Sequence, residues 1–196
     1  MGRWAKVKDR YARIRVLTPR RASNLLRLSK SYRQARLSGK PIMPLGTMPT
    51  SLSIEPTTSC NLRCPECPCG LRSFTRPTGM LNIDNACNWV DNLAPWLTYI
   101  NLYFQGEPLL HPKLDVLISK CTENGIYSST STNAHYLTKS RCDSLIESGL
   151  SRLIVSIDGL TQETYASYRI GGKLSKVMEG TKTMLETKRQ HGSGPH

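Results

Sequence analysis

Long apolar segments are missing from this chain of 196 residues. No uncharged apolar run approaches the roughly 18 residues that a membrane-spanning helix needs. The first residues, Met-Gly-Arg-Trp-Ala-Lys, carry charges with no apolar stretch behind them, so the N-terminus does not resemble a secretory signal. With 38% hydrophobic and 21% charged residues, the composition is typical of a globular protein. We therefore expect a cytoplasmic protein without a transmembrane segment.

Acidic residues are almost absent from the first 41 positions, where Asp9 alone stands among 13 Lys and Arg. Residues 42–196 hold 14 bases and 13 acids, so twelve of the thirteen net positive charges belong to the N-terminal arm. Pro19 is followed by a helical pattern whose apolar side chains share one face: Leu25, Leu28, Tyr32 and Ala35. Such a basic helix suits an anionic membrane surface or a nucleic acid, or it packs on its own domain with a solvated basic face. The sequence leaves these three interpretations open.

A stretch rich in Pro and Gly separates the arm and its linker (1–50) from a core (51–196) that alternates strand and helix patterns. Strands are predicted at 51–57, 98–104, 126–132 and 152–157, and helices at 84–93, 113–123, 138–147, 162–168 and 174–189. This alternation predicts an α/β fold of parallel βαβ units. The second and fourth strands are nearly continuous apolar runs, so we expect them to be covered on both faces.

The third predicted strand is unusually polar, because hydroxyl side chains fill most of the run from Tyr127 to Thr132. A buried parallel strand of this kind leaves polar groups unsatisfied unless one face borders a wet or ligand-filled cavity. The alternative is an edge strand that faces solvent.

Seven cysteines are distributed unevenly, and four of them lie within ten residues: Cys60, Cys64, Cys67 and Cys69. Without a secretory signal, a disulfide framework is not expected. Three thiols in one short loop can hold three irons of a four-iron cluster and leave the fourth iron open to an external chelator. Zinc is the competing occupant, with Cys69 as a fourth ligand. A group of plain buried or redox-reactive cysteines is the third interpretation.

The spacing Cys60-x3-Cys64-x2-Cys67 resembles the signature of the radical S-adenosylmethionine superfamily. Gly106-Glu107-Pro108, after the second strand, and Ser156-Ile157-Asp158-Gly159, after the fourth, are similar to further motifs of that family. Residues 165–172 follow in the manner of the branch whose members carry a C-terminal SPASM domain. The likeness covers about residues 51–190, and each motif falls at the carboxyl end of a strand, where parallel α/β folds place their sites.

The resemblance implies an enzyme with two cofactors, a [4Fe-4S] cluster on Cys60, Cys64 and Cys67 and S-adenosylmethionine on the open iron. Reductive cleavage of S-adenosylmethionine would give a 5′-deoxyadenosyl radical that abstracts hydrogen from a substrate. The residues implied in binding this cofactor are Gly106 and Glu107 for its amino group, Ser156 and Arg169 for its carboxylate with Asp158 beside them, and Thr132 and Asn133 for its ribose or other polar parts. A reducing electron-donor protein is expected, and the substrate, a small molecule or a peptide, is not identified.

Barrels of this family usually contain more βα units than the four predicted here. We therefore expect an incomplete parallel (β/α) barrel of the radical SAM type with a basic helical arm, truncated from a longer protein or completed by a partner. The fourth strand would then expose an unpaired edge. Two other functions stay open, a module that binds the cluster and S-adenosylmethionine without turnover and a zinc-stabilised nucleic-acid binder.

Overall fold

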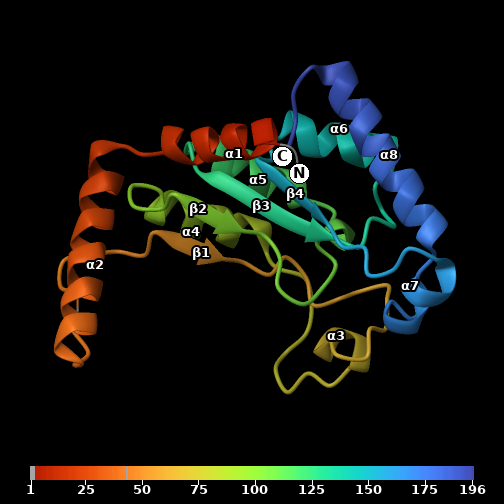
Figure 1. The fold of residues 1–196 in the computed structure, drawn as a ribbon, viewed down its shortest axis with the longest axis horizontal. Coiled ribbons are helices and arrows are strands. Elements are labelled where there is room, and N and C mark those ends of the chain that lie inside the picture. Colours follow the sequence, from red (N-terminus) through yellow and green to blue (C-terminus); the bar gives the residue numbers. More distant parts are fainter. Residues whose placement is uncertain (1–2, 43) are drawn as a thin grey trace.

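A parallel sheet of four strands runs through the centre of the molecule in the order β1-β2-β3-β4 (Figure 1). The structure is a computed structural model and describes residues 3–42 and 44–196. Its strands are β1 (Ser51–Ser53), β2 (Tyr99–Asn101), β3 (Tyr127–Thr132) and β4 (Arg152–Val155). Its helices are α1 (Arg3–Arg15), α2 (Pro19–Ser38), α3 (Pro68–Leu71), α4 (Ile83–Leu93), α5 (Leu114–Glu123), α6 (Lys139–Glu147), α7 (Gln162–Tyr168) and α8 (Leu174–His191), with a 3₁₀ turn η1 (Pro108–Leu110). The predicted α/β class and parallel strand arrangement are confirmed.

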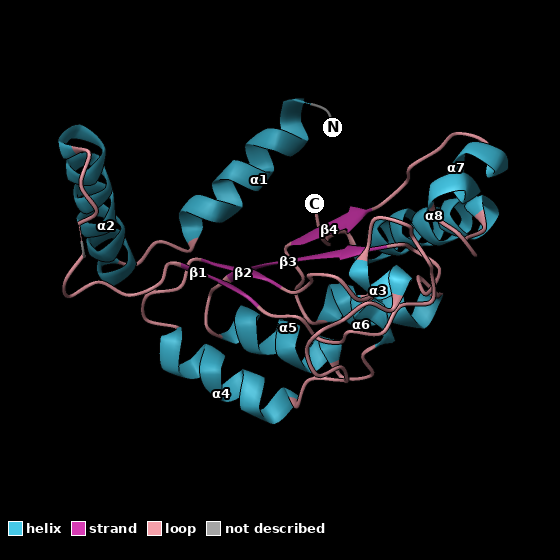
Figure 2. Cartoon of the chain, turned by 90° about the horizontal axis from the view of Figure 1, so that it is seen from below, coloured by secondary structure: helices cyan, strands magenta, loops and turns pink. Residues whose placement is uncertain are grey.

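Helices make the crossovers between neighbouring strands, and Figure 2 shows α4, α5 and α6 together on one face of the sheet. Parallel strands require such crossovers. Ile100 and Leu102 from β2 and its end share one hydrophobic core with Leu117, Ile118 and Leu145 from the helices. Because every crossover returns the chain in the same direction, the carboxyl ends of all four strands lie at one edge of the sheet.

Helices begin where the sequence offers capping side chains. Asn82 accepts a hydrogen bond at the start of α4, Thr138 does the same for α6, and Thr161 forms a capping box at α7. The five predicted helices of the core, α4 to α8, begin and end within two residues of their predicted bounds, whereas the short helix α3 was not predicted. Strands β1 and β2 are shorter than predicted, because the chain leaves the sheet soon after them. Thr57, for example, pairs with Met80 in an isolated antiparallel bridge.

The other face of the sheet carries helix α1, which the sequence did not predict (Figure 2). The Tyr127 hydroxyl donates to the buried carboxylate of Asp9, and the Arg13 guanidinium lies 5.2 Å from the Tyr127 ring centroid and 5.6 Å from that of Tyr99. The expectation that β4 is covered on both faces is wrong, since all of β4 is only half-buried. Strand β2 has Ile100 in the core on one face and Tyr99 beneath Arg13 of α1 on the other. On this face, the elements that the structure describes leave much of β4 accessible.

Strand β3 lies between β2 and β4, so the alternative of an edge strand is wrong. Five of its six residues are buried despite their hydroxyl groups. Thr130 donates to the carbonyl oxygen of Leu102 at 3.0 Å, and Ser131 and Thr132 border a cavity at the end of the strand. The expectation that this polar strand borders a cavity is confirmed.

The outer edge of β4 is not wholly bare, contrary to the prediction. The backbone N–H of His196 donates to the Ser151 carbonyl oxygen at 2.9 Å, and the N–H of Leu153 donates to the His196 carbonyl oxygen at 3.0 Å. This pair of bonds has the slanted pattern of a parallel ladder. The last residue therefore occupies the start of the position that a fifth parallel strand would take.

Helix α2 is anchored to the core by the buried side chain of Arg21. Its guanidinium donates to the carbonyl oxygens of Ala94, Asn124 and Gly125 at 2.6 to 3.2 Å. These carbonyls precede β2 and β3, so the anchor lies at the amino ends of the strands. The rest of α2 stands away from the sheet (Figures 1 and 2). None of the helices in the described part of the chain is both long and apolar enough to cross a membrane.

Candidate cluster and cofactor site

The three thiols of the loop between β1 and α3 line one cavity at the carboxyl edge of the sheet. The residues proposed from the sequence that share its wall are Cys60, Cys64, Cys67, Gly106, Glu107, Thr132, Asn133, Ser156 and Arg169. Of the residues proposed, Asp158 alone lies off this wall. Segments far apart in the sequence meet here because parallel strands bring their carboxyl ends together.

The loop that carries the thiols is folded tightly on itself. The N–H of Cys67 donates to the carbonyl oxygen of Cys64 at 3.2 Å, and α3 follows at once. A Cβ atom at Gly70 would lie 2.4 Å from the Cys64 carbonyl oxygen, so only glycine lets α3 approach the loop this closely. The N–H of Arg63 donates to the carbonyl oxygen of Ile170 at 2.9 Å, which ties the loop to the segment after α7.

Each thiol is contacted by a polar group from a different part of the fold. The contacts are Cys60 Sγ with Asn133 Nδ2 at 3.9 Å, Cys64 Sγ with Arg169 Nη1 at 3.7 Å, and Cys67 Sγ with the Gln105 carbonyl oxygen at 3.7 Å. At Cys60 and Cys64 the contacting group is an N–H donor, which stabilises the thiolate form and is one means by which proteins set the potential of an iron–sulfur cluster. At Cys67 the thiol itself donates to the Gln105 carbonyl oxygen.

Burial and nearby donors act in opposite directions on two of these thiols. Burial raises the pKa of both Cys60 and Cys64. The backbone N–H of Leu62, 3.4 Å from Cys60 Sγ, lowers the pKa of Cys60, and the guanidinium of Arg169 lowers that of Cys64. The site therefore contains donors that would stabilise thiolates once a metal replaces the thiol protons.

Cys69, the fourth cysteine of this group, lies off the cavity wall. Its buried thiol donates to the carbonyl oxygen of Thr58 at 3.0 Å, and burial raises its pKa to about 12. The Cys69 thiol is therefore directed toward Thr58 and not into the cavity that Cys60, Cys64 and Cys67 line.

The cavity wall carries three cysteine thiols, one ligand fewer than a structural zinc ion requires. Within residues 3–42 and 44–196, no three His, Cys, Asp or Glu side chains gather closely enough to hold one metal ion. A structural zinc ion requires four ligands in a tetrahedron, whereas a cluster binds one thiolate at each of several irons. The three thiols that line the cavity match the number that a cluster with one open iron would use.

Gly106 allows the segment after β2 to lie against the segment after β1. A Cβ atom at Gly106 would lie 1.9 Å from the carbonyl oxygen of Thr57. The neighbouring N–H of Glu107 donates to the Ser59 carbonyl oxygen at 2.8 Å, directly before the first thiol. The backbone of Gly106 and Glu107 is thus fixed relative to the cysteine loop.

The Glu107 side chain is 3% exposed and is extensively hydrogen-bonded. Oε1 accepts from the Leu109 N–H at 3.2 Å and the Thr132 hydroxyl at 2.7 Å, and Oε2 accepts from the Asn133 N–H at 2.8 Å. Burial raises the pKa of the carboxyl group, and these donors oppose that rise. The described partners fill three of the four acceptor positions of the carboxylate, so the residue joins the ends of β2 and β3 and retains one acceptor position.

We expect Glu107→Gln to lower the free energy of unfolding by about 1–3 kcal/mol, because the amide nitrogen faces a donor that the carboxylate accepts. Thermal unfolding of the variant and the parent protein at the same pH measures the difference. The matched change Glu123→Gln, at a side chain that is 63% exposed, should stay within about 0.5 kcal/mol. Equal melting temperatures for Glu107→Gln and the parent would contradict the prediction.

Arg169 is oriented by an ion pair with Asp158. Its Nε donates to Asp158 Oδ2, while its Nη1 lies beside the Cys64 sulfur. Asp158 thus acts on the cavity through Arg169. Across the cavity wall, the Oγ atoms of Ser156 and Ser131 lie 3.3 Å apart and join the ends of β4 and β3.

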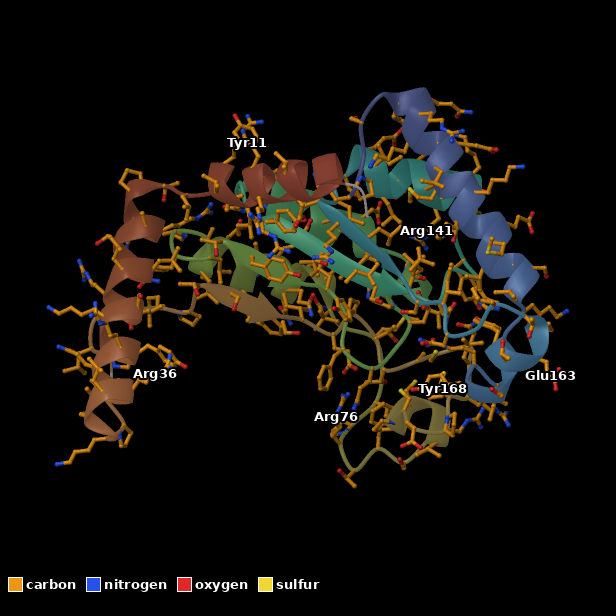
Figure 3. The ribbon with its side chains drawn as sticks, in the orientation of Figure 1. Tyr11, Arg36, Arg76, Arg141, Glu163 and Tyr168 are labelled. Atoms are coloured by element: carbon orange, nitrogen blue, oxygen red, sulfur yellow. The ribbon has the colours of Figure 1, made fainter. Side chains whose placement is uncertain are left out.

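Several wall residues were not predicted from the sequence: Leu62, Gly70, Tyr103, Phe104, Gln105, Ser131 and Tyr168. Glu55 was also missed as a supporting residue, although it accepts from the Gln105 N–H at 3.1 Å and forms an ion pair with Arg76 at 2.6 Å. Figure 3 labels both Tyr168 and Arg76 close to α3. Their position in the sequence could have indicated these residues, because Glu55 follows shortly after β1 and Phe104 and Gln105 follow shortly after β2.

Fold and site together define a partial parallel α/β barrel that presents three thiols and several polar groups at the carboxyl edge of its sheet. The family model described as the Radical SAM superfamily matches residues 54–191. The chain belongs to the radical SAM superfamily.

Curated relatives of this chain are enzymes. It is 31% identical over 137 residues to an AdoMet-dependent heme synthase of Methanosarcina barkeri (strain Fusaro / DSM 804), a match that covers 69% of this chain and 39% of the relative. It is 32% identical over 133 residues to a GTP 3',8-cyclase of Limosilactobacillus fermentum, covering 66% of this chain and 40% of the relative. The chain therefore spans about two fifths of the length of these relatives.

Solved structures show the same fold. SuiB of Streptococcus suis, bound to S-adenosylmethionine, has a TM-score of 0.63 at 19% identity over 85% of this chain and 36% of that chain. The enzyme anSMEcpe with bound AdoMet has a TM-score of 0.61 at 21% identity over 76% of this chain and 43% of that chain. The predicted partial barrel of the radical SAM type is confirmed.

Proposed function

We propose that the chain belongs to an enzyme that holds a [4Fe-4S] cluster on Cys60, Cys64 and Cys67 and binds S-adenosylmethionine at the fourth iron. When bound, these cofactors supply the reductive cleavage that gives methionine and a 5′-deoxyadenosyl radical for hydrogen abstraction. One observation carries the proposal: three thiols converge on one cavity while the neighbouring thiol of Cys69 is bonded to Thr58. Three protein thiolates leave one iron of a cubane open.

The residues around the cavity offer complementary groups for each end of S-adenosylmethionine. Arg169 supplies a fixed positive charge for the carboxylate, for which a guanidinium is well suited, and the Ser156 hydroxyl supplies a second donor. The remaining acceptor position of Glu107 and the backbone after β2 would receive the ammonium group. Thr132 and Asn133 border the cavity where the ribose would lie, although the Thr132 hydroxyl already donates to Glu107.

The partners follow from the chemistry. A reducing electron-donor protein would supply the electron, and the substrate would be a small molecule or a peptide. A peptide is supported by one fold neighbour, SuiB, whose structure has been solved with the precursor peptide SuiA, and by a 29% identical relative, the PqqA peptide cyclase of Rhodopseudomonas palustris.

The domain organisation and the branch of the family are further proposals. We infer an arm with its linker (1–50), a radical SAM core (51–196), membership of the SPASM branch and a longer parent chain. The genomic reading frame beyond His196 tests the last two, because further strands and a second cysteine cluster would have to follow. A stop codon at that point would contradict them.

The proposed activity is tested by anaerobic reconstitution with iron and sulfide. The product is mixed with S-adenosylmethionine and dithionite, and 5′-deoxyadenosine and methionine are quantified by chromatography. We expect both products to depend on the reductant and on the cluster. An intact cluster that neither binds nor cleaves S-adenosylmethionine would overturn the proposal, and binding without cleavage would indicate a module without turnover.

We expect Arg169→Ala to weaken S-adenosylmethionine binding by about 10- to 100-fold, the loss of a charge-assisted hydrogen bond of roughly 1.5–3 kcal/mol. Asp158→Asn should cause a smaller loss, because it only loosens the guanidinium. Equilibrium dialysis on the reconstituted protein measures both affinities. Arg152→Ala, which removes the same charge at the start of β4, is the control and should bind like the parent. Parent-like affinity in Arg169→Ala would contradict the assigned role.

A further inference from the structure

The N-terminal arm carries a surface that the cofactor site does not use. Among the described residues, nine of the twenty exposed large apolar side chains lie between Val7 and Leu45. Between Asp9 and Glu55 the sequence has ten Lys and Arg and no acidic residue. Asp9 itself is buried and forms an ion pair with Arg13 at 3.3 Å. Exposed apolar side chains and uncompensated positive charge therefore occur on the same part of the molecule.

Helix α2 carries exposed apolar side chains and basic side chains on one face. Leu26, Lys30, Arg33 and Leu37 recur at intervals of four, three and four residues, the spacing that places side chains on one side of a helix. All four are exposed, Leu26 by 72% and Leu37 by 78%. In the linker that follows, Leu45 is 85% exposed. Because this part of α2 stands away from the sheet, no described element covers the face (Figure 2).

Helix α1 is amphipathic, but its polar face contacts the sheet and its apolar face is exposed to solvent. Asp9 and Arg13 contact the sheet, whereas Val7, Tyr11 and Ile14 face solvent with 50 to 62% exposure. Tyr11 points away from the sheet in Figure 3. A helix at the surface of a globular protein normally buries its apolar stripe and solvates its polar face. The stripe on α1 is therefore a second exposed apolar strip flanked by basic residues.

We propose that the arm binds peripherally to the surface of a membrane that contains anionic lipids. Aliphatic side chains would enter the headgroup region, and Lys and Arg would contact lipid phosphates and carboxylates. A lipid surface fits better than a nucleic acid, because the exposed apolar side chains are mainly aliphatic. Single-stranded nucleic acids are held by stacking on aromatic rings, and Tyr11 and Tyr32 are the exposed rings among the described arm residues.

The arm and the cofactor site lie at opposite ends of the strands. Arg21 anchors α2 at the amino ends, whereas the thiols lie at the carboxyl ends. A membrane on the arm would therefore leave the cavity accessible. The membrane proposal also stands apart from the proposed chemistry, because vesicle binding can be measured on protein without a cluster.

The test is co-sedimentation of the full chain with phosphatidylcholine vesicles that contain or lack phosphatidylserine. We expect binding to the anionic vesicles alone, weakened by added salt. Lys30→Gln with Arg33→Gln should weaken it about 25-fold, at roughly fivefold for each cation. Leu26→Ser with Leu37→Ser should weaken it at least about tenfold through lost apolar burial.

The matched control joins Lys182→Gln with Leu160→Ser, exposed residues of the same types outside the arm, and should bind like the parent. Because the changed side chains are solvent-exposed, each variant should keep its helices, and circular dichroism verifies this. Equal binding to both kinds of vesicle, parent-like binding by the charge variant, or binding to an RNA oligonucleotide but not to vesicles would overturn the proposal.

Discussion

Replacing Cys64 by Ala is expected to remove the iron–sulfur cluster and all formation of 5′-deoxyadenosine. The parent protein, reconstituted without air, should hold about four irons per chain, and the variant fewer than one. Cys64 is well suited to this substitution because it is buried and its sulfur faces Arg169. Colorimetric iron analysis and the visible absorption of the cluster measure the loss.

Cys69→Ala is the control for this experiment. It removes a thiol from the same loop region, but one that donates to Thr58 and lies off the cavity wall, so about four irons should remain. Cluster retention in Cys64→Ala, or its loss in Cys69→Ala, would show that the ligands are assigned wrongly. Fewer than one iron in the parent protein would remove the cluster assignment altogether.

The second large effect is expected for Gly106→Ala. The added methyl group would lie 1.9 Å from the carbonyl oxygen of Thr57, and the obstacle is backbone that cannot rotate away. Overpacking of this kind lowers stability by about 3 kcal/mol, which corresponds to a melting temperature lower by roughly 6–12 °C. The segment after β2 should also move away from the cysteine loop, so S-adenosylmethionine binding should be lost.

Gly39→Ala separates this close contact from the general effect of removing a glycine. Gly39 has no atom within 4 Å of an added Cβ but has a φ of 65°, so its replacement should lower stability by about 1–2 kcal/mol through backbone strain. It lies at the end of α2, far from the thiols along the fold, and S-adenosylmethionine binding should be unchanged. A Gly106→Ala protein with parent-like melting and affinity would contradict the role of the close contact.

Helices of the core were predictable because their signals are local. Asn82, Thr138 and Thr161 cap α4, α6 and α7, and apolar periodicity marks the faces that enter the core. Helix α1 was not predictable by the same rules, because its polar residues Asp9 and Arg13 contact the sheet and its apolar stripe faces solvent. Only the tertiary pairing of Asp9 with Tyr127 explains how that helix packs.

Part of the candidate site could be predicted from the sequence, because its motifs lie at the ends of strands. The cysteine loop, Gly106 and Arg169 follow β1, β2 and α7, and a parallel sheet gathers such positions at one edge. The hydrogen-bond partners of each site residue could not be predicted from the sequence. The sequence suggested Glu107 as a ligand for an ammonium group, but it did not indicate that Thr132 and Asn133 donate to the buried carboxylate.

The sequence by itself determined the α/β class, the parallel direction of the strands and the three thiols at one strand end, because propensity, capping and motif spacing act over short distances. The tertiary structure decided which thiols share a cavity, which way Cys69 points and how Asp158 orients Arg169. It also decided that the arm exposes its apolar side chains. These outcomes depend on which distant segments meet at each end of the sheet, and that is fixed only when the chain packs into its complete three-dimensional arrangement.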